Sequence, residues 1–475
     1  MHPDELRRHA HAVADWIADF VAGIEDRPVL PDVRPGDVSA RLPATAPDDG
    51  ESMDAILADF DRLIVPNVTH WNHPRFHAYF ANTGSGPGIL AEALCAAVND
   101  NAMLWRTGPA ATELEIRCCD WVRDLVGLPE GFEGHIEDTA STSTLVALTA
   151  ARHRVTAGAV REHGLAGQVP LRVYCSAEAH SSVERACIVL GLGTTGCRRI
   201  DVDADFRMDP DALRAAIAED RAQGIQPMAV VATTGTTSTT SVDPVPAIAD
   251  VCRDESLWLH VDAAYGGAMG ASERFRWVLD GVDRADSLVI NPHKWLFVPM
   301  DCSVLLYRDA EAFRAAFSLV PPYLMTPEDG VARNLMDYGV ALGRRFRSLK
   351  LWFVLRWFGR KKIAAMIENH VDLAAEFARW IDGDDAWELL APAPMSTVLY
   401  RHVPKNLRGD EDVLKAHNEA IMHRVNASGS FISHTVVRGR WALRTAVGNA
   451  RTQRRHLDEL REQLVVAAGE ESSSA

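Results

Sequence analysis

The chain has 475 residues, and its 47% hydrophobic and 24% charged residues are typical of a folded globular protein rather than a disordered or fibrous one. The formal net charge of −16 argues against a surface for nucleic acid or anionic membrane, because both need clustered Lys and Arg. No stretch approaches the roughly 20 apolar residues of a membrane span. Eight scattered cysteines without a CxxC motif predict reduced thiols. We therefore expect a cytoplasmic protein that acts on a small molecule.

The chain begins with an amphipathic helical pattern over residues 1–24, followed by a Pro- and Asp-rich segment at 28–52. We assign both to an N-terminal helical arm over residues 1–80. At about 150 residues per domain, the length leaves room for roughly two further domains.

Short apolar runs alternate with helical patterns in the middle of the chain, and a large α/β domain is predicted over 81–360. The strand candidates are LRVYCSA, MAVVATTG, LWLHVDAAY, SLVINPHK and SVLLYRD. Continuously apolar strands separated by helices predict a mostly parallel sheet covered on both faces. Asp209 and Pro210 predict the start of one covering helix, as cap and first residue. Mixed shorter signals predict a small α+β domain over 361–475, whose last residues, GEESSSA, are expected to fray.

Lys294 stands in NPHKWLFVPMD, directly before a run of apolar residues. Such a lysine either snorkels to water along its own stem or is desolvated, so that its amine attacks a carbonyl. Asp262 ends the predicted strand in HVDAAYGG, and by itself it equally well caps a turn. Because parallel sheets bind ligands beyond the carboxyl ends of their strands, the carboxylate and the amine are expected in one crevice.

Two further features belong to the same sheet edge. The segment DTASTSTLVALTAAR at 138–152 opens a helix with more hydroxyl groups than a cap needs, which predicts a phosphate site. His180 follows the strand LRVYCSA, although a lone histidine is most often structural. GLGTTG at 191–196 matches a dinucleotide fingerprint, but a helix precedes it and a strand follows, so it predicts a plain turn. Together the four edge features suit one cofactor, pyridoxal 5′-phosphate.

The chain also carries THWNHPRFHAYF, PAATELE, AHSSVERA and LGRRFRSLKLWFVLRWFG in an order that resembles the group II pyridoxal-phosphate-dependent amino acid decarboxylases, of the aromatic L-amino acid decarboxylase type. The resemblance covers most of the chain. It implies an aspartate aminotransferase-type fold (PLP fold type I) and a homodimer with shared active sites, in which the arm over residues 1–80 serves dimerisation. It implies no metal. The implied reaction, through a Lys294 Schiff base, converts an aromatic L-amino acid (tryptophan, tyrosine, dopa or phenylalanine) to its amine and carbon dioxide.

The resemblance also implies roles for single residues. Lys294 is expected to carry the cofactor, Asp262 to pair with its ring nitrogen and His180 to stack on its ring. Tyr323 in VPPYLMTPEDG matches the tyrosine of the family's mobile catalytic loop, which reaches the neighbouring subunit's site. We expect this phenol to return a proton to Cα, directly or through His180. The other expected cofactor residues are Ala140, Ser141, Thr237, Ala264, Asn291 and His293.

The expected substrate residues are Trp71, Tyr79, Phe80, Asn82, Asn101, Met103 and Gly343. The aromatic members match family positions around the substrate side chain, although core packing explains them as well. The polar members depart from the pattern of the animal enzymes, and Gly343 stands where small residues in relatives leave room for indole. Three alternatives stay open: an aromatic aldehyde synthase, which differs at the loop; another PLP enzyme such as an aminotransferase; and a scaffold that binds the cofactor without turnover.

Overall fold

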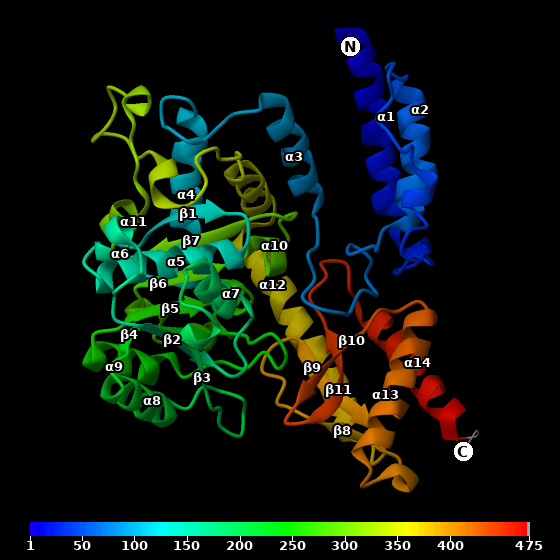
Figure 1. The fold of residues 1–475 in the computed structure, drawn as a ribbon. Helices are drawn as coiled ribbons and strands as arrows, with labels where there is room; N and C mark the ends of the chain where they lie inside the picture. The colour runs from blue at the N-terminus through cyan, green and yellow to red at the C-terminus, as the bar shows by residue number, and fades with distance from the viewer. Residues whose placement is uncertain (473–475) are drawn as a thin grey trace.

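The computed structural model describes residues 1–472, and Figure 1 shows an arm of two helices lying beside a larger body. The arm consists of α1 (Pro3–Ala22) and α2 (Met53–Asp59). Trp16 of α1 contacts Phe60, the residue directly after α2, with ring centroids 5.1 Å apart. The amphipathic helix expected at residues 1–24 is therefore present.

The arm is tied to the other end of the chain. Glu25, just after α1, accepts hydrogen bonds from Arg455 at 2.6 and 2.8 Å. Arg455 belongs to α14 (Arg454–Ser472), the last helix. The helix α14 continues to Ser472, into the segment 469–475 that is expected to fray, and residues 473–475 lie outside the described chain.

A seven-stranded sheet forms the centre of the body, in the order β1-β7-β6-β5-β4-β2-β3. Its strands are β1 (Glu133–Glu137), β2 (Leu171–Ser176), β3 (Cys197–Ile200), β4 (Gln226–Thr233), β5 (Trp258–Asp262), β6 (Ser287–Ile290) and β7 (Ser303–Tyr307). The pairs from β3 to β6 are parallel, whereas β7 is antiparallel to both β6 and β1. The mostly parallel sheet and the five predicted strands are thus confirmed.

Helices cover the sheet, as the apolar strands require (Figure 1). The helices of this part of the chain are α3 (Gly86–Val98), α4 (Pro109–Val126), α5 (Ala140–Val155), α6 (Ala159–His163), α7 (Ser182–Val189), α8 (Pro210–Ala222), α9 (Val245–Glu255), α10 (Pro292–Trp295) and α11 (Ala310–Phe317). Of these, α4, α5, α7, α8, α9 and α10 contact the strands directly. Asp209 caps α8 as predicted, accepting the N–H groups of Asp211 and Ala212. GLGTTG lies between α7 and β3, so it is a turn.

The C-terminal part carries a second sheet, which is antiparallel, in the order β10-β11-β9-β8. These strands are β8 (Trp387–Leu389), β9 (Thr397–His402), β10 (Ser433–Val437) and β11 (Arg440–Ala446), and they accompany α13 (Glu411–Ala427) and α14. The long helix α12 (Ser348–Asp382) joins this part to the body and kinks at Gly359, whose φ is 67°. The limits at 80 and 360 stay a prediction.

Candidate active site

A cavity of about 150 Å³ lies at the carboxyl ends of the central strands. Thr233 and Asp262 are the last residues of β4 and β5, and Asn291 follows β6. Parallel pairing places these ends side by side, because neighbouring strands finish at the same sheet edge. The lining residues are Phe80, Thr139, Ala140, Ser141, His180, Thr233, Gly235, Thr237, Asp262, Ala264, Tyr265, Asn291 and Lys294.

Lys294 reaches the cavity from α10, a single turn directly after β6. Its backbone N–H donates to the carbonyl of Asn291 at 2.9 Å, which fixes where the side chain leaves the strand end. Burial lowers the pKa of the Lys294 amine, while Asp262 opposes the shift and Arg444 adds to it. A lysine in these surroundings gives up its proton more readily than one in water and becomes a better nucleophile.

Aromatic rings stack behind the amine. The Nζ of Lys294 lies 5.0 Å from the ring centroid of Phe80, and Phe80 stacks on Tyr265 at 3.8 Å. Tyr265 in turn stacks on Trp295 at 4.4 Å with nearly parallel planes. This explains the apolar residues that follow Lys294 in the sequence: Trp295 belongs to the stack that walls the cavity.

The helix α5 points its N-terminus at the cavity, with Thr139, Ala140 and Ser141 in the lining. Backbone N–H groups in the first turn of a helix have no partner within it and favour an anion. The Oδ1 atom of Asn291 is buried and has no hydrogen-bond partner in the described chain. Open N–H groups fit the phosphate of a ligand such as pyridoxal 5′-phosphate, and the unpartnered amide oxygen of Asn291 can accept a hydrogen bond from a donor on a polar ligand.

His180 and Asp262 line the cavity together with Lys294, and the two side chains differ in charge. The backbone N–H of Ala264 donates to Oδ1 of Asp262 at 3.1 Å, which holds the carboxylate at the strand end. Desolvation lowers the pKa of His180, and Lys294 lowers it further, whereas Asp262 raises it. The imidazole of His180 is therefore neutral near pH 7, and its Nδ1 accepts the N–H of Ser182 at 3.2 Å.

Several expected residues lie outside this lining. His293 is buried, and its Nδ1 accepts the backbone N–H of Cys302 at 3.0 Å. Trp71 stacks on Phe76 and Tyr79 at the surface. Asn82 is half-buried near Met300.

The remaining expected residues lie near a different opening or near the loop. Asn101 and Gly343 line a separate cavity of about 610 Å³. Met103 packs against Leu104, Leu324 and Met336. Tyr323 stands on η9 (Pro322–Leu324) with 78% of its surface exposed. Within one protomer the predicted site residues therefore form two groups: those that line the cofactor cavity, and the outlying residues, which lie elsewhere.

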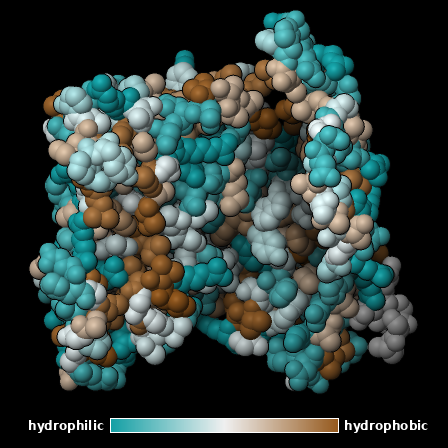
Figure 2. Space-filling view, turned by 45° about the horizontal axis from the view of Figure 1, so that its top comes forward, coloured by the Kyte–Doolittle hydropathy of each residue, from teal (hydrophilic) through white to brown (hydrophobic). Residues whose placement is uncertain are grey.

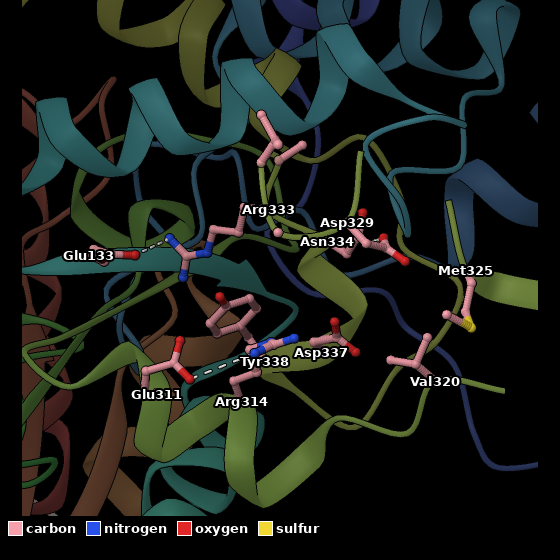
Figure 3. Close-up of a pocket in the computed structure, with 13 residues that line it drawn as sticks. Glu133, Glu311, Arg314, Val320, Met325, Asp329, Arg333, Asn334, Asp337 and Tyr338 are labelled. Carbon is pink, nitrogen blue, oxygen red and sulfur yellow. Dashed lines mark hydrogen bonds and ion pairs between the residues drawn. The ribbon is translucent and has the colours of Figure 1, made fainter. Parts of the chain in front are cut away.

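The loop that carries Tyr323 spans a cavity of about 560 Å³ (Figure 3). Val320, Met325 and Asp329 line it from the loop, and Arg314 lines it from α11. Arg333 closes the base of the loop: its guanidinium pairs with Glu133 at 2.9 Å and stacks 4.1 Å from the ring centroid of Tyr338. Arg333 thus anchors the base of the loop, and the cavity lies beneath the loop's tip.

The sequence reasoning missed four lining residues, Thr139, Thr233, Gly235 and Tyr265, together with one buried cation, Arg444. Arg444 extends from β11, donates to the carbonyls of Thr237 and Ser238, and lies 4.9 Å from the ring centroid of Phe80. Desolvation lowers its pKa to about 10. No carboxylate in the described chain pairs with it. The sequence WALRTAV contains a signal for Arg444, because this single charge interrupts an otherwise mostly apolar strand.

A family model described as "Pyridoxal-dependent decarboxylase conserved domain" matches residues 35–403. The chain belongs to this family. A pyridoxal-dependent decarboxylase needs an amine for the aldehyde of its cofactor, which Lys294 offers. No group of side chains that suits a metal ion occurs in the described chain, and none of its helices has the length and apolar character to span a bilayer.

The relatives of this decarboxylase cover almost its whole length. Phenylacetaldehyde synthase of Arabidopsis thaliana is 37% identical, over 97% of this chain and 95% of the relative. Aromatic-L-amino-acid decarboxylase of Sus scrofa is 38% identical, over 96% and 95%. A crystal structure of Oryza sativa TDC with PLP and tryptamine superposes with a TM-score of 0.94 at 35% identity, covering 99% of each chain. The expected PLP fold type I is thereby confirmed.

Proposed function

We propose that this decarboxylase converts an aromatic L-amino acid to its amine and carbon dioxide, with pyridoxal 5′-phosphate held on Lys294. The observation that carries the proposal is the single cavity at the strand ends, where Lys294, Asp262 and His180 meet the N-terminus of α5. The aromatic substrate is supported by the pig relative, named for aromatic L-amino acids, and by the tryptamine in the rice structure.

When bound, pyridoxal 5′-phosphate supplies an electron sink for the pair that departing carbon dioxide leaves behind. The chain's own side chains and backbone groups hold the cofactor and keep its ring nitrogen protonated. Asp262 keeps a proton on the ring nitrogen, because a carboxylate stabilises a cation beside it. The first turn of α5 and the side chains of Ser141 and Asn291 hold the phosphate. His180, neutral near pH 7, covers one face of the ring.

Arg444 is proposed to bind the substrate carboxylate. It is buried, carries no ion-pair partner in the described chain, and acts electrostatically on Lys294. A buried cation is costly unless an anion pairs with it, so the carboxylate of an arriving amino acid satisfies it. Phe80, which lies between Arg444 and Lys294, then contacts the rest of the substrate.

Tyr323 is proposed to donate its phenolic proton to Cα once the loop closes. The loop is fixed at its base by Arg333 and exposed at its tip, which suits a lid. A closed lid also keeps oxygen from the electron-rich centre. The Arabidopsis relative is named as an aldehyde synthase, so the product is the open question, and a phenol at position 323 favours the amine.

A homodimer with shared sites is proposed because one protomer leaves both site residues and apolar surface unused. Figure 2 shows the molecule hollowed between the arm and the body. Large apolar side chains are exposed on the arm and on neighbouring helices: Leu6, Val13, Ile56, Leu90, Leu94, Val98 and Trp357. A second copy covers such surface and brings its Tyr323, Asn101, Met103 and Gly343 toward the cofactor cavity. Eight free thiols support a cytoplasmic location.

The reaction is tested with purified protein and a panel of L-amino acids, scored for carbon dioxide and amine. Tryptophan, tyrosine, dopa and phenylalanine should yield both products in equal amounts, and glutamate and lysine neither. Lys294→Ala should lose the visible cofactor absorbance and all turnover, whereas Lys361→Ala, at an exposed lysine, should keep both. Amino-group transfer to an added 2-oxo acid would instead indicate an aminotransferase, and bound cofactor without any turnover would indicate a scaffold.

A further inference from the structure

Three of the eight cysteines form a thiol cluster between β2, β3 and α7, and the proposed decarboxylation uses none of them. Cys175 lies on β2, Cys187 lies on α7, and Cys197 begins the edge strand β3. The sulfur atoms of Cys175 and Cys197 are 3.6 Å apart, and Cys187 is also within hydrogen-bonding range of Cys197. Because Cys197 pairs with Val173 and not with Cys175 in the strand register, a disulfide between these two sulfurs requires β2 and β3 to shift against each other.

Cys197 has the surroundings of a reactive thiol. Of the eight cysteines it alone is partly exposed, because it stands on an edge strand after a glycine turn. Hydrogen bonds from the Cys175 and Cys187 thiols lower the pKa of Cys197, and the nearby guanidinium groups of Arg199 and Arg172 lower it further. Reactive cysteines occur in such electropositive, partly exposed places.

The thiol cluster is mechanically connected to His180. The backbone N–H of Ala177, one residue after β2, donates to the carbonyl of Ile200 on β3 at 2.9 Å. Arg199, also on β3, donates to the carbonyl of Ala177 at 3.1 Å. The strand that begins with Cys197 thus holds the turn that leads to His180, so a new bond between β2 and β3 acts on that turn.

We propose that the thiol cluster is a redox modification site, in which peroxide oxidises Cys197, Cys175 resolves it as a disulfide, and the linkage displaces His180. In the first step the Cys197 thiolate takes an oxygen from hydrogen peroxide and a proton, giving a sulfenic acid and releasing hydroxide as water. In the second step the Cys175 thiol attacks that sulfur, the disulfide forms and a second water leaves. Two thiols lose two electrons, and one peroxide is reduced to two waters.

The test is thiol mapping of the purified, cofactor-loaded protein after graded additions of hydrogen peroxide. Peptide mass spectrometry should find one intramolecular Cys175–Cys197 cross-link that a dithiol reductant removes. The Cys197 thiol should disappear at least about tenfold faster than the Cys252 thiol, which is buried on α9. The circular dichroism of the bound cofactor should change with cross-linking and return on reduction.

Matched variants separate the steps. Cys197→Ser should abolish the cross-link, and Cys175→Ser should leave a sulfenic acid on Cys197 that a carbon acid such as dimedone traps. Cys252→Ser should behave as the parent does. A cross-link to Cys187, or oxidation of Cys252 as fast as of Cys197, would overturn the assignment of the site. A complete Cys175–Cys197 cross-link with an unchanged cofactor signal would overturn the connection to His180.

Discussion

The indole N–H of Trp295 donates to Nδ1 of His370 at 2.9 Å, which joins the residue after Lys294 to the distal half of α12. Both side chains are buried. The bond requires an unprotonated Nδ1, and burial supplies that condition by lowering the pKa of His370 to about 4. The lysine is therefore positioned through a neutral histidine that the protein core keeps from charging.

The protein should lose stability as the pH falls below the ordinary histidine pKa. The unfolded chain takes up a proton at residue 370 near pH 6.5, whereas the folded chain does not until about pH 4, so the free energy of unfolding decreases across that window. At pH 5.5 this one group accounts for about 1.4 kcal/mol. His370→Gln keeps an acceptor for Trp295 and should show a smaller drop in Tm between pH 7.5 and 5.5 than the parent. An equal drop would contradict the assignment, and the exposed His163→Gln serves as the control.

Asp262→Asn should slow decarboxylation by about 100-fold or more, because a neutral amide does not stabilise a proton on the ring nitrogen as a carboxylate does. Cofactor content, measured by absorbance after release in alkali, should stay close to that of the parent. Asp254→Asn, at an exposed aspartate, provides the comparison. Parental turnover in the Asp262 variant would remove this carboxylate from its proposed role.

Arg444→Gln should raise the KM for the amino acid by about 10- to 100-fold, the usual cost of losing a hydrogen bond to a charged group. Inhibition by the product amine should change far less, since the amine has no carboxylate. Arg444→Lys restores the charge and should recover part of the affinity. Equal weakening of amino acid and amine would show instead that Arg444 only supports Phe80 and the Thr237 segment.

Tyr323→Phe keeps the ring of the loop residue and removes its proton donor. The reacting Cα should then meet oxygen, so that aldehyde, ammonia and hydrogen peroxide replace amine when the reaction runs under air. Amine, aldehyde and peroxide are measured together, with and without oxygen. Met325→Leu on the same loop should keep the parental products. Undiminished amine as sole product of the Phe variant would exclude the phenol as donor.

Mixing two variant chains that each form no amine should restore amine formation if Tyr323 acts across the dimer. A heterodimer of Lys294→Ala and Tyr323→Phe chains then contains one site in which both groups are native, so about one quarter of all sites recover after random exchange. If Tyr323 serves its own subunit, no site recovers. Each variant alone, mixed with itself, measures the background.

The sequence predicted the central strands well because they are continuously apolar, and it placed Lys294, Asp262 and His180 at one cavity because parallel strands end at one sheet edge. It missed β1, whose sequence EGHIE reads as polar. His135 of that strand bonds to Glu137 and to the Tyr307 hydroxyl, so the polar groups are satisfied inside the core by a partner 172 residues away. Such pairings exist only in the folded chain.

The sequence did not predict the role of Arg444 or the position of the outlying residues, and the reason is related. Arg444 reaches Phe80 and Thr237 from the second sheet, and no local pattern encodes a contact between two sheets. Asn101 and Gly343, both expected at the substrate, line another opening of the single chain. A sequence motif does not encode which opening of the fold its residues line.

The bond between Glu25 and Arg455 has a consequence for biosynthesis. The two residues are separated by 430 positions, so at translation rates of about 5–20 residues per second the arm is made roughly 20–90 seconds before its anchor. During that interval Glu25 has no partner in the C-terminal helix, and Leu6, Val13 and Ile56, which are exposed in the described fold as well, add apolar surface to the nascent arm. Transiently exposed apolar surface of this kind is what chaperones bind while the ribosome is still at work.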